Sequence, residues 1–491
     1  MSITVHQVDL RVMNVRARTP FRYGIVTMTA MPHLFVKVHA EVDGKRASGI
    51  AADHLPPKWF TKNPTSHYRD DLVDMIDCIQ MARDHAIAAK GTWNVFDWWE
   101  RIYAAQKESA TNKNYPPLLW NFGVSLVERG LIDAFCRATG MSFSQALRNK
   151  RLGIDLARLC ASPEWAICDD ICAQDYTELL PAQPLRSIIA RHTVGLIDPL
   201  TDAEIPPADR LDDGLPQSLE ASIRAYGLTH FKIKLGGDVR NDLERLRAIA
   251  AVVERSVRGD YAFTLDGNEN FKEIGPFQSL WLELFSDPTL RHFLSRLIFV
   301  EQPLHRDLAL SDAVRDALWA WPERPPMIID ESDAQLGDLG RAISCGYSGT
   351  SHKNCKGIMK GIANACIIGQ LRKANPMGRL ILSGEDLSNI GPVALPQDLA
   401  VCGNLGIEHV ERNGQHYFAG LSMFPQNTQD AVLRAHPDLY HRHPRGFPAV
   451  HLHNGRIDIS TTIDAPLGVA FELDTDQFTP LDEWKFESMG I

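Results

Sequence analysis

The stretch that decides the fold is FKIKLGG, residues 231–237, near the middle of the chain. Its apolar residues alternate with Lys232 and Lys234, which predicts a short strand with period two. The alternation places both ammonium groups on one face of that strand. Buried cations are costly unless a negative charge neutralises them. The two lysines therefore indicate either an exposed edge strand, where lysine discourages aggregation, or a site that supplies acids.

Short apolar strands alternate with helical segments on both sides of this stretch. Further strands are predicted at residues 187–190, 262–265, 297–300, 327–329, 348–351 and 379–382. Such alternation is typical of parallel strands joined by crossover helices, and so many units in one direction favour a (β/α) barrel over an open sheet. No glycine-rich phosphate loop with fingerprint spacing and no Gly-x-Ser-x-Gly elbow follows a strand. A nucleotide-binding sheet and a serine hydrolase are therefore disfavoured.

Three successive predicted strands end in a carboxylate, at Asp266, Glu301 and Asp330. Each acid could simply cap the helix that follows it. In a barrel, however, the carboxyl ends of the strands share one mouth, so the three acids would converge. Converging carboxylates repel one another unless a cation lies between them. Oxygen ligands without histidine or cysteine favour Mg²⁺ over zinc.

Beside such an ion, the lysines could take part in proton transfer. Lys232 and Lys234 precede Asp266 by one strand, and Lys353 follows the strand after Asp330. A divalent cation, a neighbouring lysine and partial burial each lower the pKa of a lysine, and a neutral lysine can remove a proton. A metal ion can stabilise the oxyanion that forms when a carbon next to a carboxylate loses its proton.

The N-terminal part of the chain has a different pattern. Residues 3–52 predict an antiparallel meander with a turn at Asp43-Gly44, and an apolar loop runs from Pro20 to Met31. Residues 70–148 have helical periodicity, whereas residues 150–186 show no clear period and are interpreted as an insertion or linker.

Composition limits the classes of partner and compartment. A net charge of −10 without a basic stripe argues against nucleic-acid binding. No apolar run approaches the length of a membrane span, and the N-terminus lacks a signal-peptide block. Nine scattered cysteines, among them Cys168 and Cys172 one helical turn apart, include no second close pair that would complete a zinc site. We expect a cytoplasmic protein with reduced thiols.

Taken in order, these motifs resemble those of the enolase superfamily, in its mandelate racemase and muconate-lactonizing enzyme group. The resemblance rests on Lys-x-Lys at residue 232, Asp-x-Asn at 266, Glu-Gln-Pro at 301, Asp-Glu-Ser at 330 and the lysine motif from Ser351 to Gly357. It implies an α/β fold, with a (β/α) TIM-like barrel and an α+β capping domain formed by the N-terminal region and the C-terminal tail. It places the capping domain at 1–150, an insertion at 151–186, the barrel at 187–435 and the returning segment at 436–491.

The resemblance also implies roles for individual residues. Asp266, Glu301 and Asp330 would bind one Mg²⁺ per subunit, with Mn²⁺ as an alternative. Lys234 would be the base on one face of the substrate, and Lys232 would hold the carboxylate and lower the pKa of Lys234. Lys353 would act on the opposite face, with Lys356 as its rival. The orienting residues would be Asn268 and Glu331, and the expected substrate contacts are Phe21, Arg22, Tyr23, His192, Glu385 and Asp386.

The expected function is Mg²⁺-dependent abstraction of the proton α to a substrate carboxylate through a metal-stabilised enolate. Racemisation, epimerisation or cycloisomerisation follows if a lysine serves each face, which would make the protein an isomerase. Elimination of water from an acid sugar, a lyase reaction, is the alternative within the enzyme class. The alternative outside the enzyme class is a barrel that binds a carboxylate without turnover. A metal-free phosphate-binding barrel would have to use the weak Gly403–Gly406 loop. We expect a small carboxylate substrate, a homo-oligomer, and no membrane partner.

Overall fold

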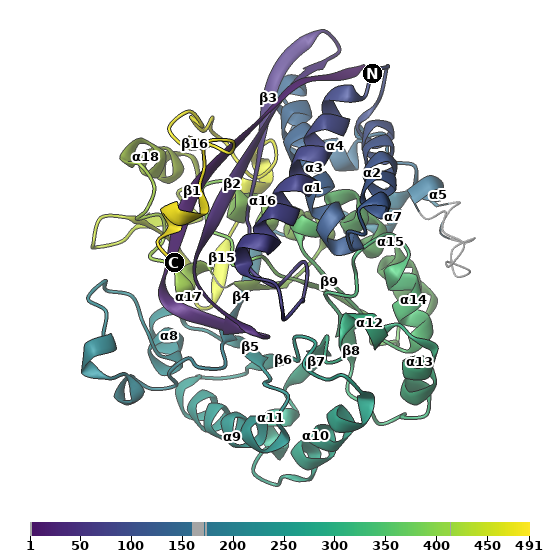
Figure 1. Ribbon diagram of the computed structural model, residues 1–491. Coiled ribbons are helices and arrows are strands. Elements are labelled where there is room, and N and C mark those ends of the chain that lie inside the picture. The colour runs from purple at the N-terminus through teal and green to yellow at the C-terminus, as the bar shows by residue number, and fades with distance from the viewer. Residues whose placement is uncertain (1, 160–170, 172–173, 413) are drawn as a thin grey trace.

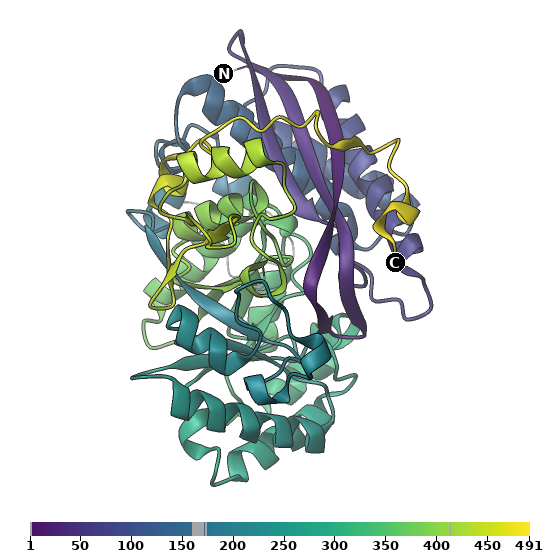
Figure 2. The ribbon, with the colours of Figure 1, turned by 90° about the vertical axis from the view of Figure 1, so that its left-hand side faces the viewer.

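The computed structural model describes residues 2–159, 171, 174–412 and 414–491. A long antiparallel sheet and the helices packed on it lie at one end of the molecule, and a barrel lies at the other (Figure 1). Seen from the side, the sheet extends along the molecule to the mouth of the barrel (Figure 2). The predicted α/β class, with a barrel and an α+β capping domain, is confirmed.

The N-terminal sheet is a meander of three strands, β1 (Ile3–Tyr23), β2 (Val26–Val42) and β3 (Lys45–His54). The predicted turn at Asp43 and Gly44 joins β2 to β3, with both residues at positive φ. The segment 20–31, predicted as a loop, is instead the end of a long hairpin in which Phe21 pairs with Met28 and Tyr23 with Val26. A register shift between Arg16 and Phe21 lets the hairpin bend towards the barrel.

Two helices, α1 (Tyr68–Ala88) and α3 (Pro117–Thr139), pack on one face of this sheet, and α2 (Val95–Asn112) packs on α1 and α3. The helix α3 is buried along nearly its whole length because the sheet, α1 and the barrel surround it. The sheet and α3 approach closely at Gly49, where a Cβ atom would lie 2.1 Å from the backbone nitrogen of Ala134. Glycine is therefore required there by contact with a neighbouring backbone.

The barrel has eight parallel strands, and pairing of the last with the first closes it. They are β4 (Ser187–Val194), β5 (His230–Lys234), β6 (Ala262–Asp266), β7 (Leu297–Glu301), β8 (Met327–Ile329), β9 (Gly349–His352), β10 (Ile381–Gly384) and β11 (His409–Arg412). The sequence predicted the first seven of these strands and did not identify β11. In such a barrel the carboxyl ends of all eight strands face one mouth.

The remaining helices surround the barrel or extend from it. The α-helices are α4 (Phe143–Arg148), α5 (Leu156–Leu159), α7 (Tyr176–Leu179), α8 (Leu219–Tyr226), α9 (Val239–Ser256), α10 (Ile274–Ser286), α11 (Arg291–Leu294), α12 (Arg306–Ala309), α13 (Asp312–Trp319), α14 (Asp338–Cys345), α15 (Ile358–Ala374), α16 (Ala394–Leu405), α17 (Gly414–Tyr417), α18 (Gln426–Ala435) and α19 (Ser460–Asp464). The short 3₁₀ turns are η1 (Asp202–Glu204), η2 (Pro207–Asp209), η3 (Asn354–Lys356) and η4 (Phe486–Met489).

The C-terminal segment runs from the barrel back to the N-terminal sheet (Figure 2). Its short strands are β12 (Tyr440–Arg442), β13 (Pro448–Val450), β14 (Leu452–His453), β15 (Arg456–Asp458) and β16 (Thr479–Pro480). Strand β15 pairs with β4 of the barrel, and β16 pairs with β1. The tail therefore forms part of the capping domain, as the sequence predicted, while the exact domain boundaries remain predictions.

Three predictions concern membrane spans, cysteines and the insertion. Among the described residues, no helix is both long and apolar enough to cross a bilayer. The six described cysteines are buried free thiols. Cys168 and Cys172 lie outside the described residues, as does much of the predicted insertion at 151–186. Where that insertion is described, it contains the short helices α5 and α7.

A buried acid joins the capping domain to the lysine-bearing loop of the barrel. Glu128 on α3 accepts hydrogen bonds from the backbone N–H groups of Ile358 and Met359, at 3.1 and 2.7 Å, at the start of α15. Burial outweighs these bonds and raises the pKa of Glu128 to about 7. A carboxyl group whose pKa is raised by folding stabilises the protein fully at acid pH and loses that contribution as the pH rises towards 7.

We expect Glu128→Gln to flatten the dependence of stability on pH. Between about pH 5 and pH 8, the wild type should lose roughly 2–3 kcal/mol of unfolding free energy that the variant does not lose. The variant should be less stable at acid pH, because an amide cannot accept both N–H bonds. Urea unfolding at both pH values measures the difference. Parallel losses in the two proteins would contradict a proton on Glu128.

Candidate active site

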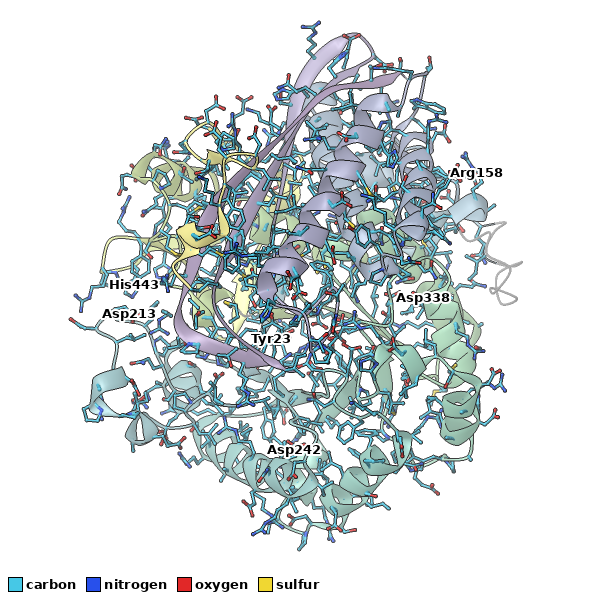
Figure 3. All side chains as sticks on the ribbon, in the orientation of Figure 1. Tyr23, Arg158, Asp213, Asp242, Asp338 and His443 are labelled. Carbon is cyan, nitrogen blue, oxygen red and sulfur yellow. The ribbon has the colours of Figure 1, made fainter. Side chains whose placement is uncertain are left out.

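The end of the β1–β2 hairpin and the loop after β3 cover the mouth of the barrel and enclose a cavity of about 40 Å³. The capping side contributes aromatic and apolar side chains: Phe21, Tyr23, Met28, Met31, Pro56 and Trp59. The barrel side contributes charged and polar ones, namely Lys234, Asn268, Lys353, Glu385, Asp386, Ser388 and Glu411, together with Leu387. Tyr23 lies at the end of the hairpin above the barrel (Figure 3) and donates a hydrogen bond to the carbonyl of Pro57, 2.8 Å away.

Lys232 lies at the centre of the charged side of the site and is fully buried. Its Nζ donates hydrogen bonds of 2.8 Å to Glu385 and Glu411, and it lies 2.9 Å from carboxylate oxygens of both Asp266 and Glu301. Burial opposes its charge, but the four acids outweigh burial and raise the pKa of Lys232 well above its usual value. Lys232 is therefore a permanent cation that holds four strand ends together.

Lys234 lies nearer the cavity, on the same face of β5. Its Nζ donates a 2.6 Å hydrogen bond to Oδ2 of Asp266, and Glu411 lies 3.8 Å away. Burial lowers the pKa of Lys234, yet Asp266 and Glu411 outweigh burial and raise it above the usual value. The ammonium form is thus favoured while these carboxylates keep their full negative charge.

Lys353 faces the cavity from the end of β9. Its Nζ lies 2.7 Å from Oδ2 of Asp330, 2.9 Å from Glu385 and 4.5 Å from the ring centre of Trp59. Lys356 is also buried, but its Nζ bonds to Oδ1 and the carbonyl of Asp330 and to the carbonyl of Ser351, and it is not part of the cavity lining. Of the two rivals, Lys353 is the one placed to meet a ligand.

Strands β5 and β9 are four strands apart in either direction around the barrel. Lys234 and Lys353 therefore approach the cavity from opposite walls. A flat group bound between them would present one face to each lysine.

The carboxylates outnumber the lysines that they contact. Asp266, Glu301, Asp330, Glu385 and Glu411 are all buried, and Lys232, Lys234, Lys353 and Lys356 are their cationic neighbours. The group therefore contains one more acid than it contains lysines.

Among the described residues, Glu301 is the acid of this group whose oxygens lack a hydrogen bond. Neither of its oxygens accepts a hydrogen bond from any described residue, although one lies close to Lys232. Burial first, and then repulsion from Glu385, raise the pKa of Glu301 well above its usual value. One carboxylate oxygen from each of Glu301, Asp330 and Glu385 lies within 4.8 Å of the others. Hard oxygen donors gathered around unpartnered oxygens fit a divalent cation such as Mg²⁺.

The predicted ligand Asp266 is arranged differently from Glu301. Its Oδ2 is bound by the two lysines of β5, and its Oδ1 accepts a 2.8 Å bond from the backbone N–H of Asn268. The structure thus brings all three predicted ligands to one mouth, and it adds Glu385 as a neighbour of Glu301 and Asp330.

The two predicted orienting residues are also at the mouth. Asn268 lines the cavity and fixes Asp266 through its backbone. Glu331 is buried, with Oε2 unpartnered by any described residue. Burial, together with Asp330 and Glu269, raises the pKa of Glu331 to about 8.

Two predicted substrate contacts lie elsewhere. His192 is buried against the ring of His416, with ring centres 4.8 Å apart, because its neighbours Arg191 and Thr193 are the residues of β4 that face the barrel interior. Arg22 is exposed, since the alternation of β1 turns Phe21 inward and Arg22 outward. Neither residue lines the cavity.

Glu385 and Asp386, two of the predicted substrate contacts, line the cavity. Asp386 is held from behind by the buried guanidinium of Arg412. Sequence reasoning missed Glu411 and Trp59. Glu411 lies in the strand HVER, whose one apolar residue is Val410, so its signal was weaker than that of Asp266. Trp59 follows β3 in a loop without periodicity and gave no signal.

Comparison of the sequence with known protein families finds no match. Comparison with curated proteins likewise finds none. Solved structures with a similar fold do exist. A dipeptide epimerase from Enterococcus faecalis V583, complexed with Mg and the dipeptide L-Leu-L-Tyr, aligns with a TM-score of 0.58 at 14% identity, covering 95% of this chain and 99% of that one.

Two further structures agree with this comparison. A mandelate racemase/muconate lactonizing protein from Herpetosiphon aurantiacus has a TM-score of 0.57 at 15% identity, covering 96% and 99% of the two chains. An enolase from Bradyrhizobium, complexed with magnesium and mandelic acid, has a TM-score of 0.52 at 13% identity, covering 93% of each chain. The chain therefore has the fold of the mandelate racemase and muconate-lactonizing enzymes of the enolase superfamily.

Proposed function

We propose that this protein is a Mg²⁺-dependent enzyme that removes the proton α to the carboxylate of a small substrate and returns a proton to the same carbon. The observation that carries the proposal is the pair Lys234 and Lys353, which line one cavity from opposite walls of the barrel. A protein that only binds carboxylates needs no proton-transfer group on either wall. This arrangement favours turnover over simple binding.

Asp266, Glu301 and Asp330 would hold the metal ion, with Glu385 beside them. A bound Mg²⁺ would supply positive charge that stabilises the substrate carboxylate after the α-proton leaves, and that offsets the acids now favouring the ammonium forms of the lysines. Lys234 takes the proton on its own face and holds it at Nζ. Lys353 donates from the other face, so that the configuration at carbon is inverted.

Lys232 keeps its proton throughout, since four acids surround it. Its role is to hold the carboxyl ends of β5, β6, β7, β10 and β11 in register. The aromatic and apolar wall formed by Phe21, Met28, Met31 and Trp59 excludes water from the reacting carbon.

The same wall bears on the choice between isomerisation and elimination. An acid sugar presents hydroxyl groups along its whole length, and apolar side chains cannot bond to them. We therefore propose racemisation or epimerisation of a carboxylate with an apolar substituent as the reaction, with acid-sugar dehydration as the alternative. From the sequence, we also propose that the enzyme is a cytoplasmic homo-oligomer.

A substrate screen in D₂O tests the proposal. N-acyl amino acids, dipeptides and acid sugars are incubated with the enzyme and Mg²⁺, and deuterium at the α-carbon is read by mass spectrometry or NMR. Isomerisation should label the α-carbon and mix its configurations, whereas dehydration should yield a keto acid. Binding of carboxylates without exchange or product in any class would favour the non-enzymatic reading.

The ligand set can be decided by two substitutions. We expect Asp266→Asn to weaken Mg²⁺ binding by about 100-fold, and Glu385→Gln by about 10-fold if Glu385 only orients the site. Isothermal titration calorimetry with Mg²⁺ measures both. A larger loss in Glu385→Gln than in Asp266→Asn would assign the ion to Glu301, Asp330 and Glu385 instead.

A further inference from the structure

A second cavity, of about 110 Å³, lies outside the barrel, beside β11 and α8. Two segments that are additional to the strands and helices of the barrel form much of the wall of this cavity. The first, 197–215, contributes Gly214 and Leu215, and the second, 420–447, contributes Leu421 and Tyr440. The function proposed above assigns no role to either segment.

The two segments are held in place by charged contacts. Arg18 on β1 forms a two-pronged ion pair with Asp213, at 2.6 and 2.9 Å, and also bonds to the carbonyl of Leu215. Arg445 of the second segment bonds to Asp212 of the first. Asp213 and His443 lie near each other on this side of the molecule (Figure 3), and a Cβ atom on Gly214 would lie 2.9 Å from the ring of His443. These contacts fix the wall of the cavity in the fold.

Two buried donors of the cavity lining lack partners. Arg412 and Tyr440 are 0% and 2% exposed. Arg412 uses two of its nitrogens on Asp386 and on the carbonyl of Asn389, but its Nε has no partner among the described residues, and neither has the hydroxyl of Tyr440. Tyr440 reaches this position because Gly391 has no side chain; a Cβ there would lie 2.2 Å from the hydroxyl.

The rest of the lining determines what could satisfy these donors. Most of it is apolar, with Leu215, Pro216, Ile390, Leu421 and Val450 among its members. Its ionisable members besides tyrosine are Arg412, His441 and His443, and no acid is among the described residues that line it. The lining also contains one acceptor, Oδ1 of Asn389, without a partner among the described residues. Two unpartnered donors and one permanent cation outnumber it, and they suit a ligand that brings an anionic acceptor and an apolar body.

We propose that this cavity binds a small monocarboxylate with an apolar body, whose carboxylate accepts hydrogen bonds from Nε of Arg412 and the hydroxyl of Tyr440. The site is separate from the candidate active site and does not depend on the function proposed for it. The two are neighbours, however, because Asp386 lines the active-site cavity and is bound by Arg412 from behind. Occupancy of the second cavity would thus be felt at Asp386.

Phenylacetate is a suitable probe, with phenylacetamide as its uncharged counterpart. Crystals of the full chain are soaked with each compound, and calorimetry measures affinity in solution. We expect phenylacetate in the second cavity with its carboxylate on Arg412 and Tyr440, and at least about 10-fold weaker binding of phenylacetamide. The soaked crystals separate this site from any binding at the active site. A cavity that holds only water, or equal affinity for both compounds, would overturn the proposal.

Variants test the assignment without disturbing the ion pair of Arg412. Tyr440→Phe removes one donor and should weaken phenylacetate binding about 5- to 10-fold. Ala225→Phe, at an exposed position of α8 in the cavity lining, should block binding. Arg224→Phe is the matched control, since it places the same ring at the neighbouring exposed position, which does not line the cavity. Unchanged affinity in Ala225→Phe, or equal loss in Arg224→Phe, would contradict the site.

Discussion

Replacing Lys234 by alanine is expected to slow exchange of the substrate α-proton with solvent deuterium by at least about 1,000-fold, for the enantiomer whose proton faces β5. Proton transfer by a positioned side chain contributes roughly 10²–10⁴-fold to a rate, and among the described residues no other lysine lines that wall of the cavity. Lys232 lies on the same strand, but it is buried and is not part of the lining. Lys232 cannot substitute, because four carboxylates hold its proton. Deuterium incorporation in D₂O, measured on the best substrate from the screen, provides the readout.

Lys353→Ala is the matched control for this experiment. If each lysine serves one face, then Lys353→Ala should lose exchange of the opposite enantiomer and keep exchange of the first. Both variants should lose racemisation. Loss of all exchange in Lys234→Ala alone would indicate a single base and favour elimination. Full exchange in Lys234→Ala would remove Lys234 as a base, provided that Mg²⁺ still raises the melting temperature of the variant as it does that of the wild type.

The acids and lysines of the site were predictable because each stands at the end of a short strand. Asp266, Glu301 and Asp330 follow apolar runs of a few residues, and parallel strands of a barrel necessarily bring such positions together. Strand β11 escaped prediction because it has only four residues, one apolar, between turn-forming neighbours. Because β11 was not predicted, Glu411, the fourth acid around Lys232, was not predicted as a site residue either.

Two predicted substrate contacts, His192 and Arg22, do not line the cavity, and the reason is where their strands end. A strand predicted at 187–190 leaves His192 in the loop at the barrel mouth, whereas β4 continues to Val194 and its alternation turns His192 outward. A loop predicted from Pro20 leaves Arg22 free to face a ligand, whereas β1 continues to Tyr23 and fixes Arg22 on the exposed face. Strand periodicity beyond a proline or a charged residue depends on pairing partners, which lie far away in sequence.

The sequence also could not predict which lysine pairs with which acid. Two lysines on one strand face predict neighbouring acids in general, but the choice of partner depends on side-chain geometry. In the structure, Asp266 forms ion pairs with the lysines of β5, and Asp330 forms ion pairs with Lys353 and Lys356. Glu301 is the acid that these pairings leave without a hydrogen bond from any described residue.

Glu301→Gln is expected to weaken Mg²⁺ binding by at least about 100-fold while leaving the fold intact. Substitution of residues that merely orient metal ligands typically costs roughly 10–100-fold in affinity, so a direct ligand should cost at least as much. Without Mg²⁺ the variant should be no less stable than the wild type at neutral pH. Burial, and then repulsion from Glu385, raise the pKa of Glu301, so its ionised form destabilises the folded state above its unfolded pKa, and the neutral amide removes that penalty.

Mg²⁺ should therefore raise the melting temperature of the wild type but not that of Glu301→Gln, since a ligand stabilises a protein only when it binds the folded state. Calorimetry gives the affinity, and thermal unfolding with and without Mg²⁺ gives the stability. Glu411→Gln is the matched control, because Glu411 is also buried beside Lys232 but lies outside the group formed by Glu301, Asp330 and Glu385. Equal Mg²⁺ affinity in Glu301→Gln and the wild type would place the ion elsewhere. In that case, the excess negative charge at the barrel mouth would have to be relieved by a proton held on Glu301.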